Sequence, residues 1–544
     1  MSHTRTTRTA LGVAVALTLA AVAQQVTLVA GLGGVLPGWQ PWPFLLGAAP
    51  AWWLARPRWR NADLPGPLRR ALRGVRRIPA PAYLVTVLAA AAVAWAVLQD
   101  HEPRLGHEEA VYANKARSWA DGSPDAGWGS YRPPGLPALG RLALAVHDDV
   151  GSLRTVALLL TLFTLVTTYL VVARWTTPHR AVVVVALLLS GLGFLRRVPE
   201  FLNDIGTTGL LLIVVFLLTR AQEVRHSRAL PVAAAVAVAA IHMRYGSVGN
   251  LLATALAALF AYGPRAWLAQ GRRLALALAV LLVGLLPHFV HAARHTGSPL
   301  GLILWAGSQA NRVYVGDGLV YYLAIFPYRL AGDLGALVMA GGLLLTARAL
   351  RARHDGAPVT RRRVFLGSTS VLVFVVLGLA TDGEPRFVYL PVVLLTVLGV
   401  EAVAERSGRW ARALLAALAG LAGLTTAGTA QVVAHGAMPG PDRLSRSVAP
   451  VAERLASEGP CLLVTGYEPE MGWYSGCDAV TYAQYRRMAP PPGTRVTLVL
   501  FEHGRLQPDD AALARLVAGR DTTVRTIPTD GALGTATTIT LDPV

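Results

Sequence analysis

Long apolar segments alternate with short polar connections over roughly the first four-fifths of the chain. Apolar segments of this kind predict membrane-spanning helices. Thirteen are predicted, at residues 10–30, 41–55, 82–98, 155–173, 181–195, 205–219, 229–241, 247–262, 274–293, 330–347, 364–380, 387–403 and 413–433. Several fall short of the roughly 20 residues that cross a bilayer, so either flanking residues complete them or some of them are re-entrant.

The pattern changes at His435 to that of a water-soluble domain. Residues 444–458 and 508–518 predict helices, and residues 461–465, 496–501 and 523–527 predict strands. Alternation of helices and strands favours a small three-layer α/β domain. We therefore divide the chain into a multi-span transmembrane domain, residues 1–434, and a C-terminal α/β domain, residues 435–544.

Composition agrees with a polytopic α-helical membrane protein. Of 544 residues, 53% are hydrophobic and 15% charged, and the mean hydropathy is +0.46. The net charge is +19, but the basic residues separate the apolar segments instead of forming a stripe with aromatic residues, which argues against a nucleic-acid partner. Only one of the 50 basic residues, Lys115, is a lysine. This bias is typical of a GC-rich genome, and we expect a bacterial source such as an actinobacterium.

Arginine is concentrated in every second connection between the predicted spans. These connections are cytoplasmic by the positive-inside rule. They lie near residues 5–8, 56–77, 174–180, 220–228, 265–273, 348–363 and 406–412. The opposite connections, at 99–154, 196–204, 243–246, 294–329 and 381–386, are then outside the plasma membrane. An odd number of spans places the C-terminal domain outside too. The first span could instead be a signal peptide cleaved near Ala21-Val22-Ala23.

Cys461 and Cys477 are the two cysteines, and both belong to the C-terminal domain. Outside the membrane we expect them to form a disulfide that closes a short loop and stabilises the fold by about 3 kcal/mol. Two unpaired buried thiols are the alternative.

The densest polar cluster lies in the first long external connection. It contains His101, Glu102, His107, Glu108, Glu109, Tyr112, Lys115, Arg117 and, further on, Arg132. If residues 108–119 are helical, then Glu108, Tyr112 and Lys115 share one face. A carboxylate beside a cation suits a general base next to a phosphate-binding group, although a solvated charged face has the same spacing.

Three motifs in this order resemble those of GT-C superfold glycosyltransferases, in particular the protein O-mannosyltransferase and aminoarabinose transferase group. EEAVYANKAR at 108–117 is similar to the acidic motif that opens their first external loop. YRPPGLP at 131–137 is similar to their Pro-Pro segment, and EPRFVYLP at 384–391 to the opening of a late transmembrane helix. The resemblance covers roughly the first 400 residues.

The resemblance implies a fold, a reaction and a site. Glu108 matches the acid proposed as catalytic base, with Glu109 beside it, and Arg132 matches the basic residue before the two prolines. Because the family usually has aspartate at the first position, either glutamate could act. The donors implied are sugars on a polyprenyl phosphate, and the acceptors are hydroxyls of an envelope glycan, lipid or protein outside the membrane.

The same chemistry makes sense independently. Attack of an alcohol on a sugar phospholipid needs a carboxylate to take the proton and cations to stabilise the departing phosphate. Arg196, Arg197, Arg244 and Arg386 lie on the external side, where the positive-inside rule does not place arginine, so they are candidate substrate contacts with Tyr112, Lys115 and Arg132. Lipid headgroups could also explain them. Asp204, with Glu200, could pair with these arginines or orient the acceptor.

We predict no metal and no cofactor, because the histidines and acids have no recognised ligand spacing. Our interpretation is an inverting glycosyltransferase that uses a lipid-linked sugar as donor. Mannose and arabinofuranose are both reasonable sugars if the source is actinobacterial. A transporter or flippase of an envelope lipid is the main alternative, although we find no internal repeat of the kind such folds carry. A scaffold without activity is a third possibility.

Overall fold

The computed structural model describes residues 2–35, 41–59, 63–101, 103–121, 132–224, 227–308, 313–325, 328–435, 443–456 and 459–541. Two compact units divide the chain. Unit 1 comprises Met1–Leu98, Leu158–Val198 and Asn203–Ala437. Unit 2 comprises Gln99–Ala157, Pro199–Leu202 and Met438–Val544. The first long external connection of the sequence thus belongs to the same unit as the C-terminal sheet domain.

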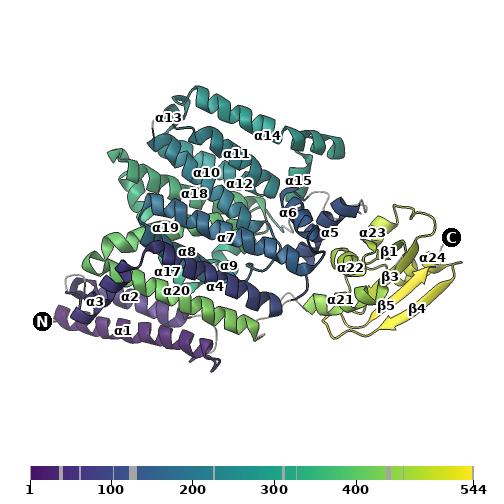
Figure 1. Cartoon of the computed structure of the whole chain (residues 1–544), viewed down its shortest axis with the longest axis horizontal. Coiled ribbons are helices and arrows are strands. Elements are labelled where there is room, and N and C mark those ends of the chain that lie inside the picture. Colours follow the sequence, from purple (N-terminus) through teal and green to yellow (C-terminus); the bar gives the residue numbers. More distant parts are fainter. Residues whose placement is uncertain are drawn as a thin grey trace. The chain divides into compact units, whose positions relative to one another are not determined.

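Unit 1 is a bundle of helices (Figure 1). The α-helices are α1 (Ser2–Val29), α2 (Trp42–Trp59), α3 (Gly66–Arg77), α4 (Ala80–His101), α7 (Val150–Trp175), α8 (Pro178–Ser190), α9 (Leu192–Leu195), α10 (Asp204–Glu223), α11 (Ala229–Met243), α12 (Ser247–Tyr262), α13 (Pro264–Leu268), α14 (Arg272–Thr296), α15 (Gly301–Ser308), α16 (Asp317–Ile325), α17 (Tyr328–Arg351), α18 (Pro358–Ala380), α19 (Tyr389–Arg406) and α20 (Ala411–Ala434). Three 3₁₀ helices join them, η1 (Arg353–Asp355), η2 (Pro385–Val388) and η3 (Gly408–Trp410).

The predicted multi-span architecture is confirmed. In the described part of the chain, nine helices are long and apolar enough to cross a membrane, and α8, α11 and α12 are shorter apolar helices. Helix α14 exposes large apolar side chains, with Leu282 65% and Val283 70% accessible. A soluble protein rarely exposes such a continuous apolar face, whereas lipid accommodates it.

Small residues let the helices of unit 1 approach closely. Helices α17 and α19 pack against each other. A Cβ added to Gly342 would collide with the carbonyl oxygen of Leu395, and one added to Gly399 with the carbonyl oxygen of Val338. This is the packing expected where van der Waals contact, and not exclusion of water, holds helices together.

The helices of unit 2 that precede the sheet domain are α5 (His107–Asp121), α6 (Gly135–Leu144) and the first turns of α7. Asp149 caps α7, because its Oδ1 accepts a hydrogen bond from the Ser152 amide at 2.7 Å. Gly140 of α6 lies so close to Phe201 that a Cβ there would be 2.7 Å from its ring. Residues 199–202 are thereby packed into unit 2.

The sheet domain contains α21 (Arg443–Leu455), β1 (Cys461–Val464), α22 (Glu468–Ser475), β2 (Asp478–Val480), α23 (Tyr482–Tyr485), β3 (Arg495–Phe501), α24 (Asp510–Val517), β4 (Thr522–Ile527) and β5 (Ala536–Leu541). The strand order is β2-β1-β3-β5-β4. Strands β2, β1 and β3 are parallel, whereas β5 is antiparallel to both β3 and β4.

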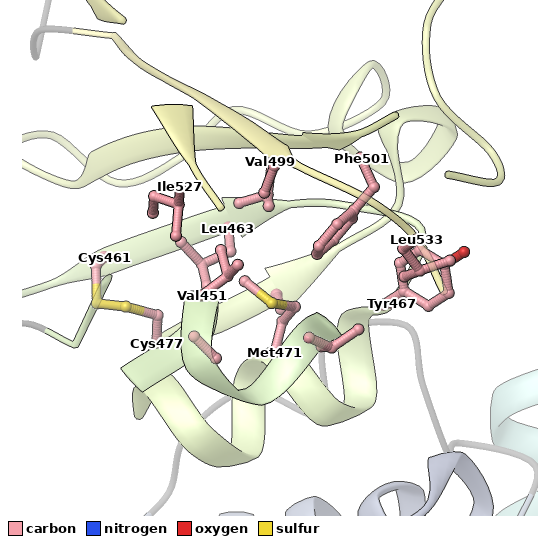
Figure 2. Close-up of a cluster of buried hydrophobic side chains, with 14 residues drawn as sticks. Val451, Cys461, Leu463, Tyr467, Met471, Cys477, Val499, Phe501, Ile527 and Leu533 are labelled. Carbon is pink, nitrogen blue, oxygen red and sulfur yellow. A yellow bond between two sulfur atoms is a disulfide. The ribbon is translucent and has the colours of Figure 1, made fainter. Parts of the chain in front are cut away.

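The predicted three-layer arrangement is also confirmed. Side chains alternate along β1, so Leu463 points to a core with α21 and α22, and Leu462 to a core with α23 and α24. Figure 2 shows the first core, with the disulfide at one end and Tyr467 and Leu533 at the other. Cys461 and Cys477 form the predicted disulfide, which encloses α22.

Candidate functional site

Helix α5 carries the acidic motif in its first turn, where carboxylates favour the positive end of the helix dipole. Every residue from 109 to 116 is buried, the polar Asn114 and Lys115 included. This part of the helix is therefore fixed on all sides, and its polar residues have defined positions.

The three residues predicted to share one face of α5, Glu108, Tyr112 and Lys115, all lie near Arg132. The Arg132 guanidinium lies 2.7 Å from a Glu108 oxygen and 5.4 Å from the centre of the Tyr112 ring. The buried Lys115 donates a hydrogen bond from Nζ to the Arg132 carbonyl oxygen at 3.0 Å. Arg132 therefore links the two residues, because its side chain pairs with Glu108 and its carbonyl oxygen binds Lys115. Glu102 of the polar cluster and Tyr131 of the YRPPGLP motif lie outside the described residues.

Glu109 has a different environment. Its side chain is 6% exposed, compared with 34% for Glu108. Its carboxylate accepts hydrogen bonds from the amides of Gly106 at 3.0 Å and Phe201 at 2.8 Å, and lies 3.4 Å from Arg154. Burial raises the pKa of Glu109 above its ordinary value, and the nearby Glu200 acts in the same direction against Arg154.

These environments separate the roles of the two glutamates. Adjacent residues of a helix point about 100° apart, so only one of them can share the face of Tyr112 and Lys115. Glu108 does so and remains accessible, whereas Glu109 joins α5 to Arg154 and to the segment at Phe201. Of the two carboxylates, Glu108 is the more accessible.

Unit 1 holds the remaining candidates. Asp204 begins α10 and lies 3.0 Å from Arg244, and both side chains are largely buried. The Arg244 guanidinium covers the Phe387 ring at 4.4 Å. Asp204 therefore has an arginine partner, one of the two roles that the sequence allowed.

The late EPRFVYLP motif forms η2 and the start of α19. Within it, Arg386 lies 2.8 Å from Glu384 and 5.6 Å from the centre of the Phe387 ring. The Tyr389 hydroxyl donates to the carbonyl oxygen of Gly193. Arg196 and Arg197 follow α9 and are half-buried. The motif thus places Phe387 between two paired arginines, while Arg196 and Arg197 remain predicted substrate contacts.

Sequence reasoning missed the contact between α5 and α22. His107 lies 3.1 Å from Glu470, Asn114 donates to the Pro469 carbonyl oxygen at 2.7 Å, and the Arg117 guanidinium stacks 3.6 Å above the Trp473 ring. Burial disfavours the charged form of His107 and lowers its pKa. The hydrogen bond to Glu470 and the negative charge of that carboxylate have a larger combined effect, so the pKa of His107 is raised above its ordinary value. The partners are more than 350 residues apart, and no local pattern joins them.

Across the described ranges, no group of three or more His, Cys, Asp or Glu side chains is arranged to hold a metal ion. The prediction that the protein uses no metal and no cofactor stays a prediction.

Residues 131–291 match the family described as dolichyl-phosphate-mannose-protein mannosyltransferase. This segment, less than a third of the chain, includes Arg132 and Arg244 but begins after α5. No curated protein matches the chain in sequence.

Solved structures match over most of the chain. ArnT from Cupriavidus metallidurans bound to undecaprenyl phosphate has a TM-score of 0.64 at 16% identity, over 85% of this chain and 98% of that protein. The oligosaccharyltransferase from Archaeoglobus fulgidus in its apo form has a TM-score of 0.52 at 12% identity, over 82% of this chain and 74% of that protein. The fold that the three motifs implied is confirmed.

Proposed function

Taking the GT-C fold as the premise, we propose that this protein is an inverting glycosyltransferase. It moves a sugar from a polyprenyl-phosphate donor to a hydroxyl of a cell-envelope acceptor at the outer face of the plasma membrane. The observation that carries the proposal is the accessible carboxylate of Glu108 beside the Arg132 guanidinium, with Lys115 bound to the Arg132 carbonyl oxygen. A transporter of a lipid phosphate could use phosphate-binding cations, but it needs no general base beside them.

The chemistry assigns a role to each of these residues. The acceptor oxygen attacks the anomeric carbon from the side opposite the phosphate, while Glu108 takes the hydroxyl proton. The bond between that carbon and the phosphate oxygen breaks, and its electron pair remains on the polyprenyl phosphate. The Arg132 guanidinium lies over the Tyr112 ring. As negative charge develops on the leaving phosphate, Arg132 breaks its ion pair with Glu108 and binds the phosphate instead. The product has the inverted anomeric configuration.

The donor assignment has two supports. The family matched by residues 131–291 is described by its dolichyl-phosphate-mannose donor, and the ArnT structure that shares this fold binds undecaprenyl phosphate. Both ligands are polyprenyl phosphates. We assign Arg196, Arg197, Arg244 and Arg386 as further substrate contacts, and Asp204 as the group that orients Arg244.

A bacterial plasma membrane with the C-terminal domain outside is part of the proposal. The disulfide between Cys461 and Cys477 supports it, because such bonds persist in oxidising compartments outside the cytoplasm.

Two experiments test the proposal. The first incubates the purified protein in detergent with polyprenyl-phosphate mannose or polyprenyl-phosphate arabinofuranose and envelope extract, and measures release of polyprenyl phosphate. The second compares the envelope glycans of wild-type and deletion strains. We expect release that requires the extract, and loss of one defined sugar linkage in the deletion strain. Movement of an envelope lipid across liposomes without cleavage of the sugar–phosphate bond would contradict the proposal and favour a flippase.

A further inference from the structure

Unit 2 joins α5 to the C-terminal domain through one short helix. Helix α22 contributes three separate contacts to α5, from the Glu470 carboxylate, the Pro469 carbonyl oxygen and the Trp473 ring. The Arg117 guanidinium also donates to the Trp473 carbonyl oxygen at 3.0 Å. Glu470 and Trp473 are buried, at 2% and 6% exposure.

The contacts with α22 are distributed along one face of α5. His107, Asn114 and Arg117 are spaced by seven and three residues, which places them on one face of a helix. Just before α5, the Leu105 amide donates to the Tyr474 hydroxyl at 2.6 Å. The start, middle and end of α5 are therefore all held by the same eight-residue helix.

Helix α22 is too short to be stable alone, since isolated helices need about 12 residues or more. Two features of the sheet domain fix it. Met471 is fully buried in the core against β1 and β3, and the disulfide joins the start of β1 to Cys477, just after α22. Figure 2 shows Met471 and the disulfide on the same side of the sheet.

We propose that the C-terminal domain is a positioning device for the catalytic helix, and that α22 and its disulfide hold α5 in the orientation that presents Glu108. This inference rests on the proposed function only for the identity of the reaction. The residues that join α5 to α22 are positioning residues, because none of them contacts the Glu108 carboxylate. They are His107, Asn114 and Arg117 of α5 and Trp473 of α22.

The test compares two variants with one control in the purified full-length protein. Asn114→Leu removes the hydrogen bond to Pro469, and Trp473→Leu removes the ring beneath Arg117. The control, Asp509→Ala, removes the cap of α24, where Asp509 accepts from the Ala512 amide at 2.7 Å. The control destabilises the C-terminal domain without touching α22.

Backbone hydrogen exchange and transfer kinetics are measured for each protein. We expect amides of α5 to exchange at least tenfold faster in Asn114→Leu and Trp473→Leu, and kcat to fall at least tenfold with an unchanged donor KM. Asp509→Ala should change neither quantity in this way. Unchanged exchange in α5, or an equal loss of kcat in the control, would overturn the inference. If the wild type transfers no sugar but α5 still exchanges faster in the two variants, the proposed function is refuted and the positioning role of α22 stands.

A second, independent feature is the short helix α3 between α2 and α4. At 100° per residue, Arg69, Arg70, Arg73 and Arg77 fall within an arc of about 100°. Leu68, Leu72 and Val75 occupy the opposite side, and the extended Ile78 follows the end of the helix. Val75 and Ile78 are 41% and 44% exposed, whereas Leu68 and Leu72 are half-buried, so the apolar side of this element is partly exposed.

A helix with one strongly basic side and one exposed apolar side is typical of elements that lie in a membrane interface. Helix α3 has no acidic residue, and its arginines complement an anionic surface. It ends close to α4, where the Tyr83 hydroxyl donates to the Val75 carbonyl oxygen at 2.9 Å. We propose that α3 binds anionic phospholipid headgroups at the face of the membrane where arginine is concentrated, with its apolar side among the acyl chains.

The test uses full-length protein in nanodiscs of phosphatidylcholine alone or with one-third phosphatidylglycerol. We expect α3 amides to exchange at least tenfold more slowly with phosphatidylglycerol, and Arg69→Gln/Arg70→Gln/Arg73→Gln to abolish the difference. A control with the same charge change, Arg351→Gln/Arg353→Gln/Arg361→Gln, should retain it. Equal exchange in the two lipids, or loss of the difference in the control, would contradict lipid binding by α3.

Discussion

Two adjacent glutamates of α5 show what single residues decide in this protein. Sequence alone offered both as candidate bases, because the motif has an acid pair where the family usually has aspartate at the first position. The helix phase predicted that Glu108 shares a face with Tyr112 and Lys115, and the structure brings that face to Arg132. The partners of Glu109 were not predictable, because Arg154 and Phe201 lie 45 and 92 residues away in the chain.

The first prediction concerns stability. Glu109→Gln turns one carboxylate oxygen into an amide donor that faces the Gly106 amide and Arg154, and leaves the buried Arg154 charge without its acid. We expect a loss of roughly 2–4 kcal/mol, seen as a lower unfolding temperature in detergent, with a milder effect on turnover per folded molecule. An unchanged unfolding temperature would show that Glu109 does not anchor α5.

The second prediction concerns donor binding. Arg132→Ala removes the cation beside Glu108, and donor KM should rise roughly 10- to 100-fold, the range expected for a charge-assisted hydrogen bond to phosphate. The matched control is Arg141→Ala on α6, which should leave donor KM unchanged. If Arg132→Ala instead removes the protein from the membrane, Arg132 is structural.

At the scale of elements, apolar length and helix or strand period predicted most of what forms. Twelve of the thirteen predicted segments each coincide with one helix, because an apolar run in lipid has no other way to satisfy its backbone. The segment 181–195 is divided at Gly191 into α8 and α9. Five elements of the sheet domain were predicted, whereas α22, α23, β2 and β5 were missed. Strand β2 has only three residues, and α22 contains Pro469 and Gly472, so neither leaves a clear period.

The third prediction tests helix packing in unit 1. A Cβ at Gly399 would meet the carbonyl oxygen of Val338, a backbone atom that cannot move independently of α17. Gly399→Ala should therefore lower the unfolding temperature in detergent. Gly420→Ala on α20 is the control, because nothing lies within 4 Å of its Cβ position and alanine favours a helix. A stable Gly399→Ala protein would show that the α17–α19 contact is not rigid.

At the scale of the whole molecule, the sequence predicted a membrane domain followed by a sheet domain. It did not predict that the first external connection folds with the C-terminal domain into unit 2. That union depends on contacts such as Asn114 with Pro469, which join positions 355 residues apart. Long-range contacts of this kind leave no trace in the local pattern of a single sequence.

The fourth prediction concerns topology. A cysteine introduced at the exposed Arg520 should react with a membrane-impermeant maleimide in intact cells, because the arginine alternation places residues 435–544 outside. A cysteine at Arg353, in a connection predicted to be cytoplasmic, should react only after the cells are opened. The reverse pattern would contradict the proposed orientation.

The fifth prediction tests the central claim most directly, by measuring sugar transfer from a polyprenyl-phosphate sugar with the wild type and Glu108→Gln under identical conditions. Glutamine keeps the volume and the accepting oxygen of Glu108 but cannot take a proton. We predict that turnover falls roughly 100-fold or more while donor affinity stays nearly unchanged. Near-wild-type turnover of Glu108→Gln, or loss of activity in Glu109→Gln alone, would contradict the assignment of Glu108 as the base.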